Sequence, residues 1–347
     1  MKNILNKSVL VGSALLLSTA LVSAQTTVSG NVDIGYKAIR TNNSKATSYG
    51  VMTKETQINL QTKGAAASGW SYAAGFSIEN DGTDVGAVGT HTENTYIDLI
   101  NGGTTISLSA DHLPNGNYTI TNIVGGVADI DDIAGGIAGQ TPAMLSGHGA
   151  SASFGLGVIQ DFGFAKASFF YAPSGTNAPG DNDGKTTMST ATGLLNSFKE
   201  ITVRGDMGVK GLDAGVVYNW IESDETTAGA TNDVTNYLVS LKYTFANGFA
   251  LAGELAEAET KAGLNTKTKA IGIGYAINKD TTIGYQLART NLSTAATPTE
   301  KIQGINIGYN LGPVALTAVL VDVSDVAATT TTGRDGRGAH IGASVKF

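Results

Sequence analysis

The sequence lacks cysteine, has only 6 prolines and 2 tryptophans, and contains no long apolar run after residue 24. Without cysteine, disulfide bonds cannot supply its stability. Without a long apolar run in that part of the chain, a membrane-spanning helix is excluded there. The 45 glycines do not indicate disorder, because many of them lie inside segments that alternate between apolar and polar residues. Glycine at this density suits a twisted, closed sheet.

The first 24 residues are predicted to be a cleaved secretory signal. Lys2 and Lys7 supply its positive charge, the apolar run covers residues 9–21, and Val22-Ser23-Ala24 is a small-residue cleavage site. Export leaves 20 of the 22 basic residues against 29 acidic ones, a formal net charge of −9. A chain this acidic is a poor partner for nucleic acid, since phosphate binding needs a basic surface.

The remaining chain, residues 25–347, is predicted to be one all-β domain. Segments of about ten residues with a period of two recur along its whole length, separated by turn residues. Sixteen such segments are predicted: 27–38, 55–63, 70–79, 95–100, 104–110, 151–159, 164–171, 199–209, 214–221, 235–245, 249–258, 266–277, 281–290, 301–309, 314–321 and 337–347. The face assignment is weakest for 314–321, where both faces are apolar.

The connections between these segments alternate between short turns and longer polar loops. Short ones carry turn sequences such as Asn101-Gly102-Gly103 and Asn278-Lys279-Asp280. This asymmetry is typical of a transmembrane barrel, with short periplasmic turns and long extracellular loops. Because hydrocarbon does not tolerate an open sheet edge, the sheet must close on itself.

The strand number predicts which face is inside. A barrel of about eight strands can fill its interior with side chains, whereas one of about sixteen leaves an aqueous lumen. Such a lumen needs a polar lining, so the apolar set must face lipid. The aromatic residues agree with this, because they gather near the two ends as interfacial belts do. They are Trp70, Tyr72, Tyr243, Phe245, Phe249, Tyr309 and Phe347 near short turns, and Tyr171, Tyr218 and Trp220 near long loops.

The last strand alternates almost perfectly and ends on Phe347. This ending, the leader, the opening strand 28–36 and the rhythm of turns and loops together resemble the general porins of Gram-negative bacteria, which are sixteen-stranded trimers. The resemblance covers residues 25–347. It implies that Phe347 closes the barrel, that the protein lies in the lipid of the cell outer membrane, and that three copies form a homotrimer.

The third long connection, 111–150, is the longest. In the family this loop folds into the lumen and makes a constriction, and its length fits that role. The resemblance therefore implies that Asp129, Asp131 and Asp132 line the constriction, whereas a helix cap or a solvated loop face would explain the same residues. The alternation predicts that further charged side chains line the pore: Asp33, Lys37, Glu79, Asp98, Lys166, Arg204, Asp206, Lys242 and Glu254. The arginine ladder of well-studied family members has no counterpart in the early strands.

No reactive or metal-binding constellation is predicted. The four histidines, His91, His112, His148 and His340, are dispersed. Asp181-Asn182-Asp183-Gly184 lacks the later glutamate of a calcium loop. There is no Gly-x-Ser-x-Gly elbow, so an outer-membrane enzyme is the least favoured alternative.

These observations favour a porin that passes ions and small hydrophilic solutes by passive diffusion, without a cofactor. Net acidity and the acidic third loop predict a weak preference for cations. Two alternatives stay open. A substrate-selective channel of the same architecture would need a defined lumen site, and a structural or adhesive barrel would have a plugged lumen.

Overall fold

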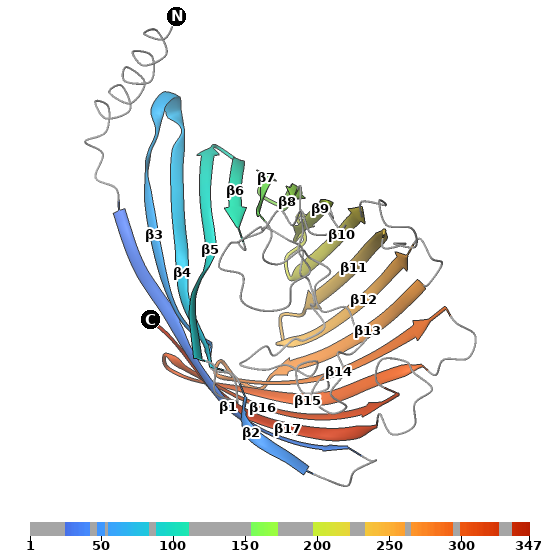
Figure 1. Ribbon diagram of the computed structural model, residues 1–347. Coiled ribbons are helices and arrows are strands. Elements are labelled where there is room, and N and C mark those ends of the chain that lie inside the picture. Colours follow the sequence, from blue (N-terminus) through green and yellow to red (C-terminus); the bar gives the residue numbers. More distant parts are fainter. Residues whose placement is uncertain are drawn as a thin grey trace, which may run out of the picture.

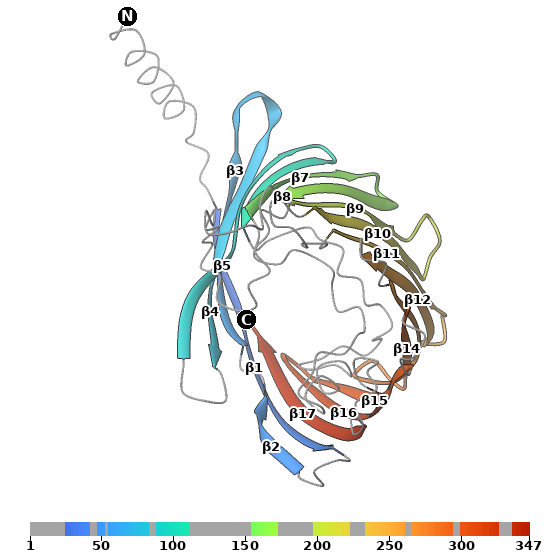
Figure 2. The same cartoon turned by 45° about the vertical axis from the view of Figure 1, so that its right-hand side comes forward.

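A single antiparallel sheet closes on itself to form a barrel (Figures 1 and 2). The computed structural model describes residues 25–41, 47–52, 55–82, 88–110, 154–172, 197–222, 233–260, 265–293, 299–325 and 335–347. The predicted leader and the third long connection, with Asp129, Asp131 and Asp132, lie outside these ranges. No helix among the described residues is long and apolar enough to cross a membrane.

Seventeen strands are described in the sheet, and each of the sixteen predicted segments coincides with one of them. The strands are β1 (Gln25–Thr41), β2 (Thr47–Met52), β3 (Glu55–Ala65), β4 (Ser71–Gly82), β5 (Val88–Asn101), β6 (Thr104–Ala110), β7 (Phe154–Asp161), β8 (Ala165–Ala172), β9 (Ser197–Gly205), β10 (Leu212–Glu222), β11 (Val234–Thr244), β12 (Phe249–Thr260), β13 (Asn265–Ala276), β14 (Thr281–Leu292), β15 (Glu300–Leu311), β16 (Val314–Ser324) and β17 (Gly336–Lys346). One turn of 3-10 helix, η1 (Ala67–Gly69), joins β3 to β4.

Strands β2 and β3 together occupy one position in the barrel, which therefore has sixteen positions. Gly35–Arg40 of β1 pairs with β2, and Gln25–Val32 pairs with β3. The register in which β1 pairs with β2 differs by one residue from the register in which it pairs with β3. A shift of one residue reverses the faces of the side chains, which explains why the sequence pattern predicts β3 but misses β2.

The barrel closes where β1 meets β17. The two strands pair from Asn31↔Lys346 to Thr41↔Gly336. The pairing continues through reciprocal backbone hydrogen bonds, in which Gly30 N–H donates to Phe347 O (2.9 Å) and Phe347 N–H donates to Gly30 O (3.0 Å). The first and last described strands, β1 and β17, therefore lie side by side, as Figure 2 shows.

The two ends of the barrel differ. At the turn end, seven connections of at most six residues join β3–β4, β5–β6, β7–β8, β9–β10, β11–β12, β13–β14 and β15–β16. The opposite end, here called the loop end, has the long connections 111–153 and 173–196. It also has short ones, since only residues 261–264 separate β12 from β13. These strands extend beyond their predicted ends and shorten the loop.

Successive side chains point to opposite faces of the sheet, and the two faces differ in polarity. Large apolar side chains cover the outer face and are exposed, among them Ile34, Ile97, Leu156, Val239, Leu255, Ile271, Ile305, Leu320 and Ile341. The inner face carries buried polar side chains on the alternate positions. This arrangement is the reverse of that in a water-soluble barrel and fits a hydrocarbon environment.

Aromatic side chains gather near both ends of the outer face. At the turn end Phe245 contacts Tyr243 and Phe249, with ring centroids 4.8 and 5.8 Å apart. Toward the loop end Tyr218 and Trp220 lie 5.4 Å apart, and the Lys199 ammonium lies 5.7 Å from the Trp220 ring. Rings with a polar edge are favoured at membrane interfaces.

Candidate functional site: the inner face of the barrel

The inner face is lined by polar side chains from nearly all parts of the sheet. They come from non-adjacent residues of each strand, because only every second residue points inward. The buried members are Ser77, Glu79, Ser107, Ser109, Glu200, Thr202, Asn219, Asn236, Ser240, Glu254, Thr268, Gln286, Thr290, Glu300, Asn306, Thr317 and His340. Such a wall can hydrate ions and solutes, but a buried polar lining does not by itself identify the solute.

The structure places eight of the predicted pore-lining residues on the inner face: Asp33, Lys37, Glu79, Asp98, Lys166, Arg204, Lys242 and Glu254. Asp206 follows β9 in a turn, where its carboxylate accepts a hydrogen bond from Gly208 N–H (2.9 Å). The alternation therefore predicts the face of these eight residues, while their effect on permeation stays a prediction.

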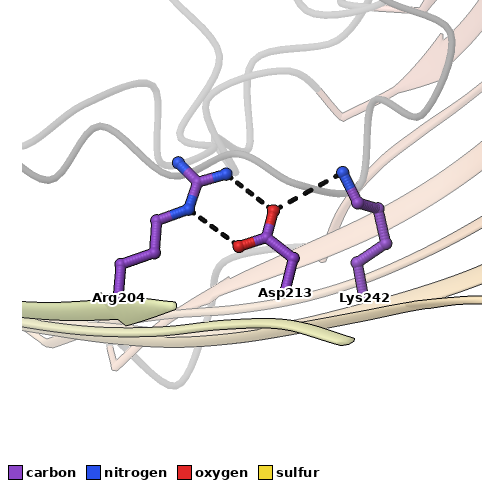
Figure 3. A network of polar contacts seen from close by, with 3 residues as sticks. All are labelled: Arg204, Asp213 and Lys242. Atoms are coloured by element: carbon purple, nitrogen blue, oxygen red, sulfur yellow. Dashed lines mark hydrogen bonds and ion pairs between the residues drawn. The ribbon is translucent and has the colours of Figure 1, made fainter. Parts of the chain in front are cut away.

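A basic cluster lies on the inner face near the turn end (Figure 3). The Arg204 guanidinium donates two hydrogen bonds to the Asp213 carboxylate, from Nε (2.8 Å) and from one terminal nitrogen (2.7 Å). Lys242 Nζ lies 3.6 Å from the same carboxylate. The pairing of β10 with β9 and β11 brings the three together, since Asp213 lies directly opposite Lys242. Two cations share one carboxylate, so the cluster is formally positive.

A third basic residue extends this cluster along the wall. Lys166 of β8 lies directly opposite Arg204 of β9, so both point to the same face. Its Nζ lies 3.6 Å from the Asp161 carboxylate, and its side chain is 68% exposed. A pair as exposed as this one contributes little to stability, about 0–1 kcal/mol. The Lys166 ammonium therefore stays accessible to solvent on the inner face.

Farther toward the loop end, β9, β10 and β11 carry buried amide and carboxylate side chains that are linked by hydrogen bonds. Asn236 donates a hydrogen bond to Asn219 (2.7 Å), and Asn219 donates to Glu200 (3.3 Å). Thr202 donates to the other carboxylate oxygen of Glu200 (3.3 Å). Sequence reasoning missed Glu200, although it lies two and four residues from the inward-facing Thr202 and Arg204. The alternation of the strand indicates that Glu200 points inward. The sequence does not show that the residue is buried, with only 2% of its surface exposed.

Two more carboxylates are buried on the inner face, at different positions around the barrel. Glu254 of β12 lies opposite Ser240 and Ala270, and Glu300 begins β15. Their residues are 4% and 0% exposed. Ala250, Ala252, Ala256, Ala270 and Ala288 place small apolar side chains on the same part of the wall.

The seam between β1 and β17 carries an inward imidazole. His340 lies opposite Lys37 and is 1% exposed. Its ring covers Gly35 of the neighbouring strand so closely that a Cβ at Gly35 would overlap it. Within the part of the chain that the structure describes, no three His, Cys, Asp or Glu residues are grouped to hold a metal ion.

Comparison with known proteins gives structural matches only. No family model matches the sequence, and no curated protein does. Among solved structures, the anion-selective porin from Comamonas acidovorans has a TM-score of 0.68 at 16% identity, covering 94% of this chain and 100% of that one. Two mutants of the porin from Rhodopseudomonas blastica both give a TM-score of 0.61, at 14% and 15% identity, covering 93% of this chain and 100% of theirs. The solved structures that the chain resembles are thus porins rather than enzymes. The chain has the closed, sixteen-position antiparallel barrel of the Gram-negative porins.

Proposed function

We propose that the protein is an outer-membrane porin, in which ions and small hydrophilic solutes cross a water-filled lumen by passive diffusion. The observation that carries this proposal is the reversal of polarity, with apolar side chains exposed outside and polar side chains inside. A barrel of this strand number leaves an aqueous lumen, and the described part of its inner wall offers charge and hydrogen bonding to a solute. The likeness in fold to the Comamonas and Rhodopseudomonas porins supports the proposal.

The same proposal includes the cellular setting. The leader of residues 1–24 is removed near Ala24, and residues 25–347 insert into the outer membrane with the turn end toward the periplasm. Three copies associate as a homotrimer. The third long connection contributes Asp129, Asp131 and Asp132 to the constriction, which the other pore-lining charges surround.

We further propose a weak preference for cations. The chain is net acidic, and its third long connection carries Asp129, Asp131 and Asp132 and no Lys or Arg. The basic residues of the wall oppose this preference, but Asp213 and Asp161 partly compensate those near the turn end. The Comamonas porin is anion-selective, so the fold alone does not imply a cation preference and the sign must be measured.

Planar-bilayer recording of the purified, detergent-folded protein under a salt gradient tests both proposals. Conductance steps in groups of three indicate an open trimeric pore, and the sign of the reversal potential gives the selectivity. A folded barrel without conductance contradicts the porin and favours a structural or adhesive barrel. Saturation of the current by one solute class would favour a substrate-selective channel.

Replacing Asp213 with Asn offers a sharper test of the wall charges. The substitution leaves Arg204 and Lys242 without their shared carboxylate, so the reversal potential should move toward anions. Asp206→Asn removes an equal charge from the adjacent turn, where Asp206 binds only the Gly208 backbone in the described structure, and should shift the potential less. Equal shifts would show that only net charge matters.

A further inference from the structure

Six basic residues form a belt on the outer face at the loop end. This outer basic belt consists of Lys267 and Lys269 of β13, Arg289 of β14, Lys301 of β15, Arg337 of β17 and Arg40 of β1. All six side chains are exposed, and each shares its face with lipid-facing residues of its own strand, such as Ile271 on β13 and Ile305 on β15. Each lies within a few residues of the loop end of its strand.

The belt places like charges opposite one another. Lys269 lies directly opposite Arg289, Arg289 lies directly opposite Lys301, and Arg40 lies directly opposite Arg337. Like charges at directly opposed positions destabilise a sheet. A run of three such cations on adjacent strands therefore favours an anionic counterpart.

Acidic side chains within the described structure compensate only part of this charge. Glu257 binds Lys267 (2.7 Å), and Asp322 binds Arg337 (2.8 Å). For Arg40, Lys269, Arg289 and Lys301, the described residues provide no ion-pair partner. Four positive charges on the lipid-facing side are thus left for a partner outside the described structure.

A groove of about 610 Å³ opens on the outer face at one end of the belt. Its polar edge is formed by Arg40, Arg337, Asp322, Gln303 and Tyr285, and its body by small or aliphatic residues that include Ala38, Ala339, Ile305 and Leu320. The volume lies within the range of about 300–1,000 Å³ that is usual for small-molecule sites. A charged edge beside an apolar body matches an amphiphile with an anionic head.

We propose that the outer basic belt binds a phosphate-bearing acyl lipid in the leaflet at the loop end, with the phosphate on the arginines and lysines and an acyl chain in the groove. Guanidinium groups bind phosphate through paired hydrogen bonds, and each basic residue near an anionic membrane surface contributes about 1 kcal/mol. This inference rests on the barrel lying in lipid, as proposed above, but not on its conducting ions.

A lipid fits the belt better than a second copy of the chain. The outward-facing acids with described side chains on the neighbouring strands β12 and β16, namely Glu257, Glu259 and Asp322, lie beside the belt itself. In the described part of the outer face, these acids therefore form no separate acidic patch. A neighbouring copy would need such a patch to neutralise the six cations of the belt. Free phosphate would leave the apolar groove unused.

Native mass spectrometry of the delipidated, detergent-folded protein tests the proposal. The probes are a diacyl phosphatidic acid, a phosphatidylcholine with the same acyl chains, and inorganic phosphate. We expect phosphatidic acid to bind at least tenfold more tightly than phosphatidylcholine. Arg289→Gln with Lys301→Gln, and separately Arg40→Gln with Arg337→Gln, should each weaken that binding about tenfold. The matched control, Lys210→Gln with Lys279→Gln, removes two charges at the turn end and should leave it unchanged.

Several results would overturn the proposal. They are equal binding of the two lipids, unchanged binding in both belt variants, and inorganic phosphate binding as tightly as phosphatidic acid. Loss of trimers in the belt variants with no change in lipid binding would assign the belt to a second copy. Retention of the folded, heat-modifiable band on gels shows that each variant is folded. Bilayer conductance of the same samples separates a failure of this proposal from a failure of the porin proposal.

Discussion

At the scale of single residues, glycines make room for rings from neighbouring strands. The Tyr72 ring lies over Gly64, the Tyr96 ring over Gly75 and the Phe347 ring over Gly30, where an added Cβ would approach ring atoms to 2.7, 3.0 and 2.7 Å. A ring that covers a strand glycine shields the backbone and adds packing. Part of the high glycine content thus has a specific structural reason.

Gly155 offers the sharpest test of this role. A Cβ there would overlap the buried Phe170 ring and lie 2.5 Å from the Tyr171 carbonyl oxygen. Since backbone cannot yield easily, Gly155→Ala should lower the free energy of unfolding by about 1–3 kcal/mol. Gly253→Ala is the matched control, because a Cβ at Gly253 meets nothing within 4 Å. Urea titration of vesicle-folded protein, followed by tryptophan fluorescence, measures both. Equal stability of the two variants would contradict the packing argument.

For the charged residues of the inner face, the sequence predicts which way each side chain points but not which side chains contact one another. Alternation predicts that Asp33, Glu79 and Arg204 share a face, and the structure places them there. It does not predict that Asp213 receives Arg204 and Lys242 together, because that contact depends on the register of three strands. Cross-strand register is not readable from a period of two.

At the scale of elements, the sequence pattern fails where the period of two is interrupted. The structure extends β5 to Val88, although alternation predicts its start at Thr95. Pairing between β4 and β5 shifts register between Gly75 and Ser77, and Asn94 has a φ of 52°. A bulge of this kind inserts a residue and reverses the faces beyond it. The strand continues, but its alternation changes phase.

The closing strand supports a second prediction. Phe347 pairs with Gly30 through two backbone hydrogen bonds, and its ring packs against the same residue. Phe347→Ala keeps the backbone bonds but removes the ring contact at the seam, so we expect a lower folded yield in lipid vesicles. Leu311→Ala is the matched control, since Leu311 also ends a strand at the turn end and is 58% exposed against 63% for Phe347.

The fraction of heat-modifiable protein on unboiled gels gives the folded yield of both variants. A larger loss for Phe347→Ala than for Leu311→Ala indicates that the ring stabilises closure beyond its lipid-facing area. Restoration by Phe347→Tyr would support a requirement for an aromatic ring. Equal losses would assign the effect to lipid exposure alone.

At the scale of the whole molecule, the proposed function requires that the inner face of the sheet meets water and the outer face meets lipid. Because the sequence has no cysteine, an introduced cysteine is the only thiol in the variant protein. Lys166→Cys and Lys242→Cys place a thiol on the inner face, where the native side chains are 68% and 29% exposed. Val239→Cys and Leu241→Cys place one on the apolar outer face of β11, at residues that are 47% and 52% exposed.

A charged, membrane-impermeant methanethiosulfonate should therefore modify the two inner thiols in vesicle-folded protein and leave the two outer ones unmodified. The reason is that thiolate reacts in water, whereas hydrocarbon excludes both the reagent and the ionised thiol. Added charge on Lys166→Cys or Lys242→Cys should also change the single-channel conductance, because the inner wall borders the conducting path. Modification of the inner thiols without any change in current would describe a barrel whose wetted interior does not conduct. Labelling at positions 239 and 241 instead would invert the assignment of the two faces, and with it the case for a pore.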